Sequence, residues 1–250
     1  MATNSLLSGV DAGLNALGIQ APVTSGLIGW FEPGTDGPTT SKNWALGGNN
    51  ATIVGTPTYG SGYATFTANT NFLQTDLLET NDMTFFIVAR SSATFVDTAH
   101  RPALLGYQAN GSLLGAEIVV TATSGAPQCT LTEFAAYNTG SIVQESTSRA
   151  ITNFSAFKYL WGRIDSVGQA LYLLNRTDGS TETSTTTTGT RVLSAPAKLR
   201  IGSTFNTTFG GAVDVAHCSI YNSAVPTSPG IVAHYNFVQA DLLARFGITI

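Results

Sequence analysis

Apolar and polar side chains alternate along most of the chain. From Gly26 to Asn222 the apolar positions recur every second residue, the repeat of a β-strand that buries one face. Turn dipeptides such as Asn110-Gly111 and Asp178-Gly179 interrupt this pattern. The predicted strands are Leu27–Phe31, Tyr63–Thr67, Thr84–Arg90, Glu117–Val120, Cys129–Phe134, Tyr159–Ile164, Ala170–Leu174, Lys198–Ile201 and Ala212–Tyr221. Many short strands without helical stretches between them predict an antiparallel sandwich or barrel.

Two segments also indicate their place in a sheet. Thr84–Arg90 is apolar on both faces, which predicts a central strand covered on both sides. The stretch from Ser184 to Thr190 consists mostly of Thr and Ser, which predicts an exposed edge strand or a loop.

The first twenty residues have a helical repeat instead. Leu7, Val10, Leu14 and Leu17 follow one another at spacings of three, four and three, a narrow apolar stripe on one face of a helix. A helix this short is not stable alone in water, so its stripe must pack on something. Two alternatives are open: the stripe packs on its own domain, or it is an arm for self-association or attachment.

The end of the chain also predicts a helix. Ser228 can cap it, Pro229 suits its first position, and Gly247 can stop it. The apolar stripe of this helix consists of Ile231, Tyr235, Val238 and Leu242. We therefore expect a helical arm over residues 1–20, a β-sandwich over 21–226 and a C-terminal helix packed on the sandwich over 227–250.

Composition narrows the classes of protein. Charged residues make up 10% of the chain, whereas an ordinary soluble domain has about 25%. The apolar runs are only a few residues long, and a membrane helix needs about 20, so no membrane partner is expected. The 11 Lys and Arg are outnumbered by 15 acids, which argues against nucleic acid as a partner.

The N-terminus and the cysteines bear on where the protein is made. The first residues have no basic region followed by a long apolar run, so no signal peptide is visible and synthesis in a host cytoplasm is expected. Cys129 and Cys218 each lie in a strand-like run, where a buried free thiol is the usual state. A disulfide between them is the open alternative.

The order of the later strands resembles that of laminin G-like domains. Phe157–Ile164 and Ala170–Asn175, followed by Asp178-Gly179, resemble the central strand–turn–strand unit of that family. The closing half of a concanavalin A-like jelly roll is similar to Leu199–Ser203, Phe209–Val215 and Ser219–Val225. The resemblance implies an all-β, antiparallel jelly-roll β-sandwich of the concanavalin A-like class, here with short amphipathic helices at both termini. This fold hosts lectins, glycanases, adhesion modules and viral structural proteins, so it does not define a function.

The composition and the chain ends resemble those of phage or prophage virion proteins. The shared features are a charge-poor β domain rich in Thr and Gly, the absence of a visible signal peptide and a short N-terminal helical arm. A surface with few charges suits close neutral contacts within an assembly or with a sugar.

The sequence offers little for catalysis. Glycanases of this fold family use carboxylates two or four residues apart on one strand, and no Glu-x-Asp-x-Glu pattern is present. The nearest groups are Asp178 with Glu182, and Asp76 with Glu79 and Asp82, all at turn-like positions. The histidines, His100, His217 and His234, form no metal-binding motif.

Candidate binding residues lie in turn-rich stretches. The laminin G-like resemblance implies one Ca²⁺ held by loop oxygens; Asp97 and Asp178 are the metal candidates, with Asn110 and Asn206 also of the right type. A glycan site needs an exposed aromatic ring beside polar groups. The candidates for that site are Trp44, Tyr107, Asn110, Tyr137 and Asn138, with Tyr59, Asn43, Asn49 and Asn50 as further residues of this kind. The alternative is that these aromatic residues cover the rim of their own core.

The main hypothesis is a non-enzymatic virion structural protein, such as a phage decoration, fibre or tail component, located in the virion. Its stripe of Leu7, Val10, Leu14 and Leu17 is expected to mediate oligomerisation, with a trimer favoured, or attachment to other virion proteins. A host-surface glycan is a further expected partner, and Ca²⁺ is the one cofactor that the resemblance allows. A free carbohydrate-binding, lectin-like module is the alternative, and a polysaccharide hydrolase the second alternative.

Overall fold

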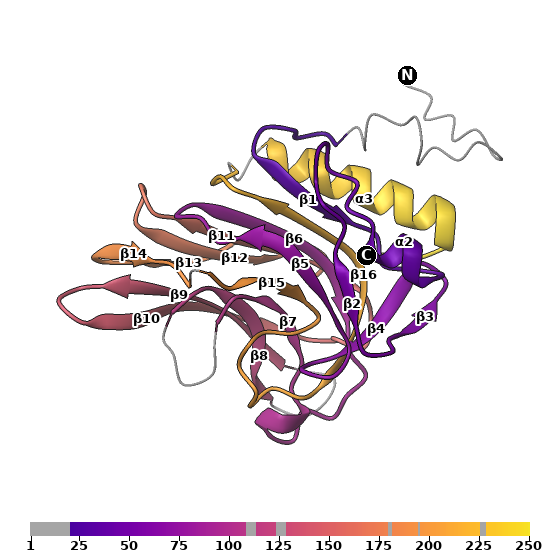
Figure 1. Ribbon diagram of the computed structural model, residues 1–250, viewed down its shortest axis with the longest axis horizontal. Coiled ribbons are helices and arrows are strands. Elements are labelled where there is room, and N and C mark those ends of the chain that lie inside the picture. The colour runs from indigo at the N-terminus through magenta and orange to yellow at the C-terminus, as the bar shows by residue number, and fades with distance from the viewer. Residues whose placement is uncertain (1–20, 109–113, 124–128, 180–181, 195, 226–228) are drawn as a thin grey trace.

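The chain folds into two antiparallel β-sheets packed face to face, with one long helix against the outside of one sheet (Figure 1). The computed structural model describes residues 21–108, 114–123, 129–179, 182–194, 196–225 and 229–250. This arrangement confirms the predicted antiparallel β-sandwich. The predicted stripe of Leu7, Val10, Leu14 and Leu17 lies outside the described residues, so the N-terminal arm stays a prediction.

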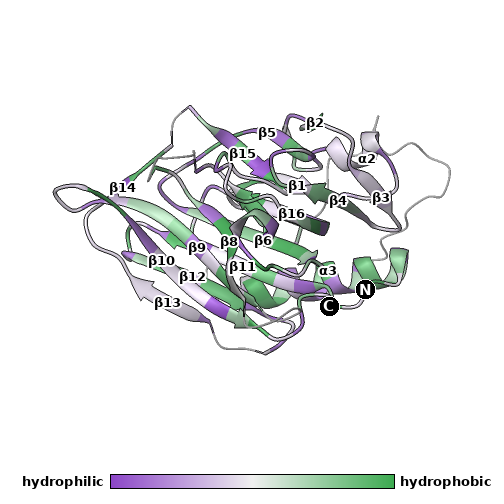
Figure 2. Cartoon of the chain, turned by 90° about the horizontal axis from the view of Figure 1, so that it is seen from below, coloured by the Kyte–Doolittle hydropathy of each residue, from purple (hydrophilic) through white to green (hydrophobic). Residues whose placement is uncertain are grey.

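The first sheet contains the strands that the sequence predicts most clearly. Its order is β13 (Thr183–Thr186), β12 (Ala170–Asn175), β11 (Lys158–Asp165), β6 (Met83–Arg90), β16 (Ala212–Tyr221), β4 (Tyr63–Thr67) and β3 (Thr58–Gly60), and β1 (Leu27–Phe31) pairs with the far end of β16. Strand β6 is buried on both faces except at Arg90, which confirms the predicted central strand. Figure 2 shows this strand largely in the hydrophobic colour.

The second sheet is less evident from the sequence. Its order is β10 (Ile142–Ile151), β9 (Cys129–Asn138), β8 (Glu117–Thr123), β7 (Ala103–Gly106), β15 (Lys198–Ile201), β5 (Phe72–Leu78) and β2 (Thr52–Val54), and β14 (Thr190–Val192) pairs with the end of β9. Strands β2, β5, β7, β10 and β14 were not predicted from the sequence. Strand β10 has no buried apolar alternation, yet all ten of its residues align with β9.

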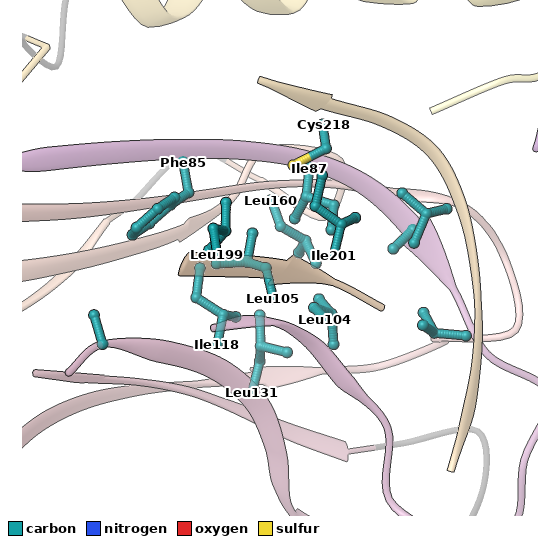
Figure 3. Packing of buried hydrophobic residues seen from close by; sticks show 14 of the residues in the cluster. Phe85, Ile87, Leu104, Leu105, Ile118, Leu131, Leu160, Leu199, Ile201 and Cys218 are labelled. Atoms are coloured by element: carbon teal, nitrogen blue, oxygen red, sulfur yellow. The ribbon is translucent and has the colours of Figure 1, made fainter. Parts of the chain in front are cut away.

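The main core lies between the two sheets (Figure 3). Phe85, Ile87 and Leu160 from the first sheet meet Leu105 and Ile118 from the second sheet, all with 0% exposure. Burying each such side chain stabilises the fold by about 1.5–3 kcal/mol. Cys129 and Cys218 belong to this core as free thiols, so the predicted buried free thiols are confirmed and the disulfide alternative is wrong.

A second apolar layer lies between the first sheet and the C-terminal helix α3 (Gly230–Phe246). Trp30, Phe86 and Trp161 on the sheet pack with Val238 and Leu242 on the helix. This layer explains why the strands of the first sheet are apolar on both faces. The helix ends at Gly247, whose positive φ of 68° suits glycine and whose N–H donates to Leu243 O at 3.0 Å, as the sequence predicts.

The short elements differ from the predictions. Helix α2 (Gly37–Ser41) was not predicted from the sequence; the Asp36 carboxylate accepts from Thr39 N at 2.8 Å and caps it. The first half of the Ser184–Thr190 stretch belongs to β13, whose described pairing is with β12, so the edge-strand alternative is confirmed there. A single turn of 3₁₀-helix, η1 (Thr98–His100), precedes β7. None of the described helices has the length and apolar character needed to cross a membrane.

Candidate functional site

The outer face of the second sheet, which points away from the first sheet, carries a network of hydrogen-bonded polar side chains. Along β9, Leu131 and Ala135 point into the core, so Thr132 and Phe134 point outward. Glu117 is aligned with Phe134 across β8 and β9 and therefore also points outward. The polar side chain of Thr132 and the aromatic ring of Phe134 therefore lie on the same outward face.

Glu117 lies in a slot that a glycine leaves open. Gly106 is aligned with Glu117 across β7 and β8. A Cβ on Gly106 would lie 2.6 Å from Glu117 Cβ and 2.6 Å from Thr204 Cγ2, too close for either. The glutamate side chain is only 2% exposed and shares a hydrogen bond with the Thr204 side chain. The slot thus holds a carboxyl group almost out of contact with water.

Two glutamine amides continue the network toward solvent. With its nitrogen turned toward the acid, the Gln108 amide donates to both oxygens of Glu117, at 3.2 Å for Oε2 and closer for Oε1. The Gln108 oxygen then accepts from Gln144 Nε2. This orientation of the amide follows from its partners, because the reverse orientation would face donor with donor. Gln108 is 4% exposed, whereas Gln144 on β10 is half-buried and reaches the surface.

Burial controls the charge of this acid. It raises the pKa of Glu117 to about 8, against a smaller lowering by the Thr204 hydrogen bond. Donation from the Gln108 amide also favours the ionised form and so acts against burial. Burial therefore favours the neutral carboxylic acid, and in that form the group can donate one hydrogen bond as well as accept.

A row of hydroxyl groups runs across the same face. Thr121 Oγ1 lies 2.6 Å from Thr132 Oγ1, which lies 2.8 Å from Ser148 Oγ. Phe134 is half-buried beside this row, in a small apolar cluster with Val119. We call the set Gln108, Glu117, Thr132, Phe134, Gln144 and Ser148 the Glu117 face. Neutral donors and acceptors beside an aromatic ring can bind the hydroxyls and the apolar patches of a sugar.

The other acids of these strands point into the sandwich. Of the acidic residues on the described parts of β7 to β10, Glu133 and Glu145 align with core-facing positions, and Glu117 alone faces outward. Glu133 is fully buried against Gly162, and burial raises its pKa to about 8. Glycoside hydrolysis needs two carboxyl groups about 5–9.5 Å apart on the substrate side. These strands do not supply such a pair on the Glu117 face.

Two of the aromatic residues predicted to bind a glycan do not lie on the Glu117 face. Tyr107 is 0% exposed and Tyr137 is 1% exposed, and both belong to the core between the sheets. The prediction of exposed rings at these positions is therefore wrong. Strand β9 continues past Phe134 and carries Tyr137 inward, although its surroundings read as a turn. Asn138 beside it is exposed, and its Oδ1 accepts from Gly140 N at 3.0 Å. Asn110 lies outside the described residues.

Trp44 is half-buried against the second apolar layer, on a different part of the molecule. The Lys42 ammonium lies 3.9 Å from the centre of its ring and occupies a face that a sugar would stack on. Asn43 is buried, and its Oδ1 accepts from Trp30 N at 2.9 Å and Ala45 N at 3.0 Å. The amide near Trp44 therefore holds its own loop in place.

The metal candidates already have protein partners. Asp97 accepts from His100 N at 3.0 Å and contacts His100 Nδ1 at 2.6 Å, capping η1. Asp178 pairs with Lys158 and accepts from Asn175 Nδ2 at 2.8 Å. Over the described ranges, no group of three or more His, Cys, Asp or Glu side chains converges as a metal site would require. The Ca²⁺ site stays a prediction from the resemblance.

Sequence reasoning missed Gln108, Glu117 and Gln144. Glu117 was assigned to a strand, but a single glutamate at the start of an apolar run carries no motif. The informative signal was the parity of the strand: if Ile118 and Val120 point into the core, Glu117 must point out. Gln144 lies in β10, which the sequence analysis did not find.

Comparisons with known proteins support the fold. No protein-family model matches the sequence, and curated proteins give no significant match. Among solved structures, the binding domain of Paraclostridial Mosquitocidal Protein 1 matches 87% of this chain with a TM-score of 0.56 at 16% identity. The binding domain of botulinum neurotoxin serotype C1 matches 86% with a TM-score of 0.59 at 9% identity.

A third solved structure is the binding domain of botulinum neurotoxin DC in complex with SialylT, with a TM-score of 0.56 at 10% identity over 86% of this chain. The chain spans about half the length of these structures, 52% in each of the three. At such low identities the likeness is one of fold. The described part of the chain is a β-sandwich of the kind found in these binding domains.

Proposed function

We propose that this protein is a non-catalytic recognition module that binds a glycan on the Glu117 face. The observation that carries the proposal is the chain of hydrogen bonds from Glu117 through Gln108 to Gln144. Gln144 is half-buried and is aligned with Ala136 on β9, two residues from Phe134 on the same face. The similar solved structures are named as binding domains, and one is a complex with SialylT, which supports binding over catalysis. Among the hypotheses from the sequence, this support favours the lectin-like module.

The chemistry of the face suits an uncharged, hydroxyl-rich ligand. Burial favours the protonated form of Glu117, and the partners on this face are amides and hydroxyls. Sugar hydroxyls both donate and accept, so they match groups that do the same. Each such neutral hydrogen bond contributes about 0.5–1.5 kcal/mol. Stacking of a sugar ring on Phe134 adds apolar contact.

Hydrolysis is the less favoured alternative. The raised pKa of Glu117 would suit a general acid, but a second carboxyl group on the same face is needed as nucleophile or base. Glu133 and Glu145 are on the other side of the sheet. Placement on a virion and assembly as a trimer rest on the composition and the N-terminal stripe, and both stay predictions.

A glycan array with the full chain tests the proposal, followed by titration of any glycan that binds. Phe134→Ala is expected to weaken binding about two- to tenfold, since the ring contributes about 0.5–1.5 kcal/mol by stacking. Trp44→Ala is the matched control and should leave the affinity unchanged. Binding that is lost in Trp44→Ala and kept in Phe134→Ala would move the site to the Trp44 loop. An array without any bound glycan, with folded protein, would remove the proposed function.

A further inference from the structure

The strands at the ends of the two sheets differ greatly in length. Along its main strand order the first sheet ends in β13 and β3, and the second sheet ends in β10 and β2. As described, β13 has 4 residues and β3 and β2 have 3 residues each, whereas β10 has 10. A short edge strand offers little backbone to a partner, so three of these four edges are protected by their length. The edge at β10 is the exception (Figure 1).

Strand β10 also lacks the other features that keep an edge strand from pairing. All its residues from Ile142 to Ile151 align with β9 without a register shift, so no bulge bends the strand. Its sequence, IVQESTSRAI, contains no proline and no lysine. Among the described strands β10 has one neighbour, β9, so one row of its backbone N–H and C=O groups faces outward. Such an edge can be extended by another strand.

The two charged side chains of β10 lie on the same face of the strand. Glu145 and Arg149 align with Ala135 and Leu131 of β9, which point into the sandwich, so both lie on the inner face. Both are half-buried. Arg149 Nη1 donates to Thr183 Oγ1 at 3.4 Å. Glu145 takes part in none of the ion pairs among the described residues. A positive charge on a strand added at this edge would give Glu145 a partner.

We propose that β10 pairs antiparallel with β10 of a second copy of this chain, around a two-fold axis at Thr147. This register sets Glu145 of each copy opposite Arg149 of the other. Opposite charges directly across an antiparallel pair stabilise it, and like charges destabilise it. The register also sets Val143 opposite Ile151, two apolar side chains that contact the core. The second sheets of the two copies then form one continuous sheet.

Other registers lose this match. An antiparallel partner must keep its inward side chains on the inner face, so the axis can move along the strand only in whole residues. With the axis at Ser146, Arg149 lies opposite Val143, a charge against an apolar side chain. With the axis at Glu145 or at Arg149, two like charges face each other. Only the axis at Thr147 pairs Glu145 with Arg149, and the symmetry makes that pair twice.

The outer face of the strand accommodates the same register. Ser146 of one copy lies opposite Ser148 of the other, and Gln144 lies opposite Ala150. These side chains are uncharged, so none repels its neighbour by charge. Gln144 and Ser148 belong to the Glu117 face, so the dimer joins two such faces on one side of the continuous sheet. Bivalent binding to a glycan rests on the proposed function, whereas the dimer does not.

Reversing one charge at a time in the full chain tests the proposal. The parent is expected to sediment as a dimer in analytical ultracentrifugation at micromolar concentrations. Glu145→Arg replaces two pairs of opposite charges by two pairs of like charges, and so does Arg149→Glu. Each variant alone should therefore raise the dissociation constant of its dimer by about tenfold. Asp76→Arg, on β5 of the same sheet, changes the net charge as Glu145→Arg does and is the control that should leave the dimer unchanged.

Mixing the two variants is the decisive step. One chain then offers only positive charges at the two positions and the other only negative charges, so every pair across the axis has opposite signs. The equimolar mixture is expected to form heterodimers with about the affinity of the parent, detected by pull-down through a tag on one chain. Circular dichroism of each variant alone shows that it is folded.

Three outcomes would overturn the proposal. A parent that stays monomeric over its whole soluble concentration range would mean that β10 does not pair with a second copy and that its edge is left to another partner. Dimers that are unchanged in both variants would place the contact on another surface. Folded variants that are weakened alone and do not combine in the mixture would rule out this register. The glycan array tests the proposed function separately, so the failure of one is distinguished from the failure of the other.

Discussion

Glu117 lies over Gly106, and a single added methyl group at Gly106 would meet the glutamate Cβ at 2.6 Å. The two residues are aligned on neighbouring strands of the second sheet. The glycine is therefore part of the site, since it makes the room in which the acid is held.

Gly106→Ala is expected to destabilise the fold. The new methyl group would also lie 2.6 Å from Thr204 and 3.1 Å from the Glu117 backbone, so the strands must shift. Overpacking of this kind costs about 1–3 kcal/mol. Urea unfolding followed by tryptophan fluorescence measures the change. Gly34→Ala is the matched control, because its nearest neighbour would be 3.5 Å away, and its stability should be within about 0.5 kcal/mol of the parent.

Glu133 should make the fold less stable as the pH rises toward 8. Its folded pKa of about 8 lies above the value of about 4.3 expected for an unfolded chain, so the folded state keeps a proton that the unfolded state has lost. Its contribution to stability is full below pH 4.3 and declines by up to about 1.4 kcal/mol per pH unit until pH 8. Glu133→Gln should remove the part of the pH dependence that Glu133 contributes.

The measurement is the free energy of unfolding at pH 6.5, 7.25 and 8 for the parent and for Glu133→Gln. Glu117 has a similar pKa, so the parent slope should fall by about half in Glu133→Gln and nearly vanish when Glu117→Gln is added. An unchanged slope in the double variant would show that neither acid is protonated in the folded state.

The layer under α3 should respond to acid in the opposite direction. His234 stacks on Phe86 at 4.0 Å and bonds to the Tyr159 and Ser219 hydroxyls at 2.8 Å, and its ring lies 5.5 Å from that of His217. Burial lowers the pKa of His217 to about 4 and that of His234 well below its usual value. Their stabilising contribution is thus present above pH 6.5 and is lost as the pH falls toward 4.

Replacing His217 should reduce this acid sensitivity. Its Nε2 is buried without a hydrogen-bond partner, and the charges that act on it are those of Glu32 and Arg245. His217→Leu is expected to lose less stability than the parent between pH 7 and pH 5, by about 1–2 kcal/mol. Urea midpoints at the two pH values provide the measurement. A variant that loses as much as the parent would contradict a neutral buried His217.

Replacing only one partner of the Glu79–Arg191 ion pair should lower the free energy of unfolding strongly. Both side chains are 1% exposed, and the Glu79 carboxylate also accepts from Ser194 N at 2.7 Å. Arg191→Met leaves a buried carboxyl group without its partner and is expected to cost about 3–5 kcal/mol. Adding Glu79→Leu should recover much of that loss, because two apolar side chains then replace the pair. Additive effects of the two substitutions in urea unfolding would argue against a coupled pair.

The sequence predicts the first sheet better than the second for a physical reason. Strands β1, β4, β6 and β16 either bury an alternating face or are buried on both, so their apolar periodicity is strong. Strand β10 packs mostly through its backbone pairing with β9 and carries Gln, Glu, Ser and Thr, so it has no apolar signal.

The candidate site could not be found in the same way. Glu117, Gln108 and Gln144 are separated along the chain and meet only because β7, β8, β9 and β10 are neighbours in the sheet. The prediction that two tyrosine rings are exposed was wrong for a related reason. Tyr137 lies close to a turn in the sequence, but it belongs to β9 and points into the core, and Tyr107, the residue after β7, is also part of that core.

The pH dependence of glycan binding tests the central claim most directly. For a glycan found on the array, the affinity of the parent should be constant near pH 6 and fall about tenfold for each pH unit above 8, as Glu117 loses its proton. Glu117→Gln keeps a neutral group that can donate, so it should bind at pH 6 within about threefold of the parent and show no fall up to pH 9. A parent and a variant with the same pH profile would contradict the claim that the neutral Glu117 network forms the binding face.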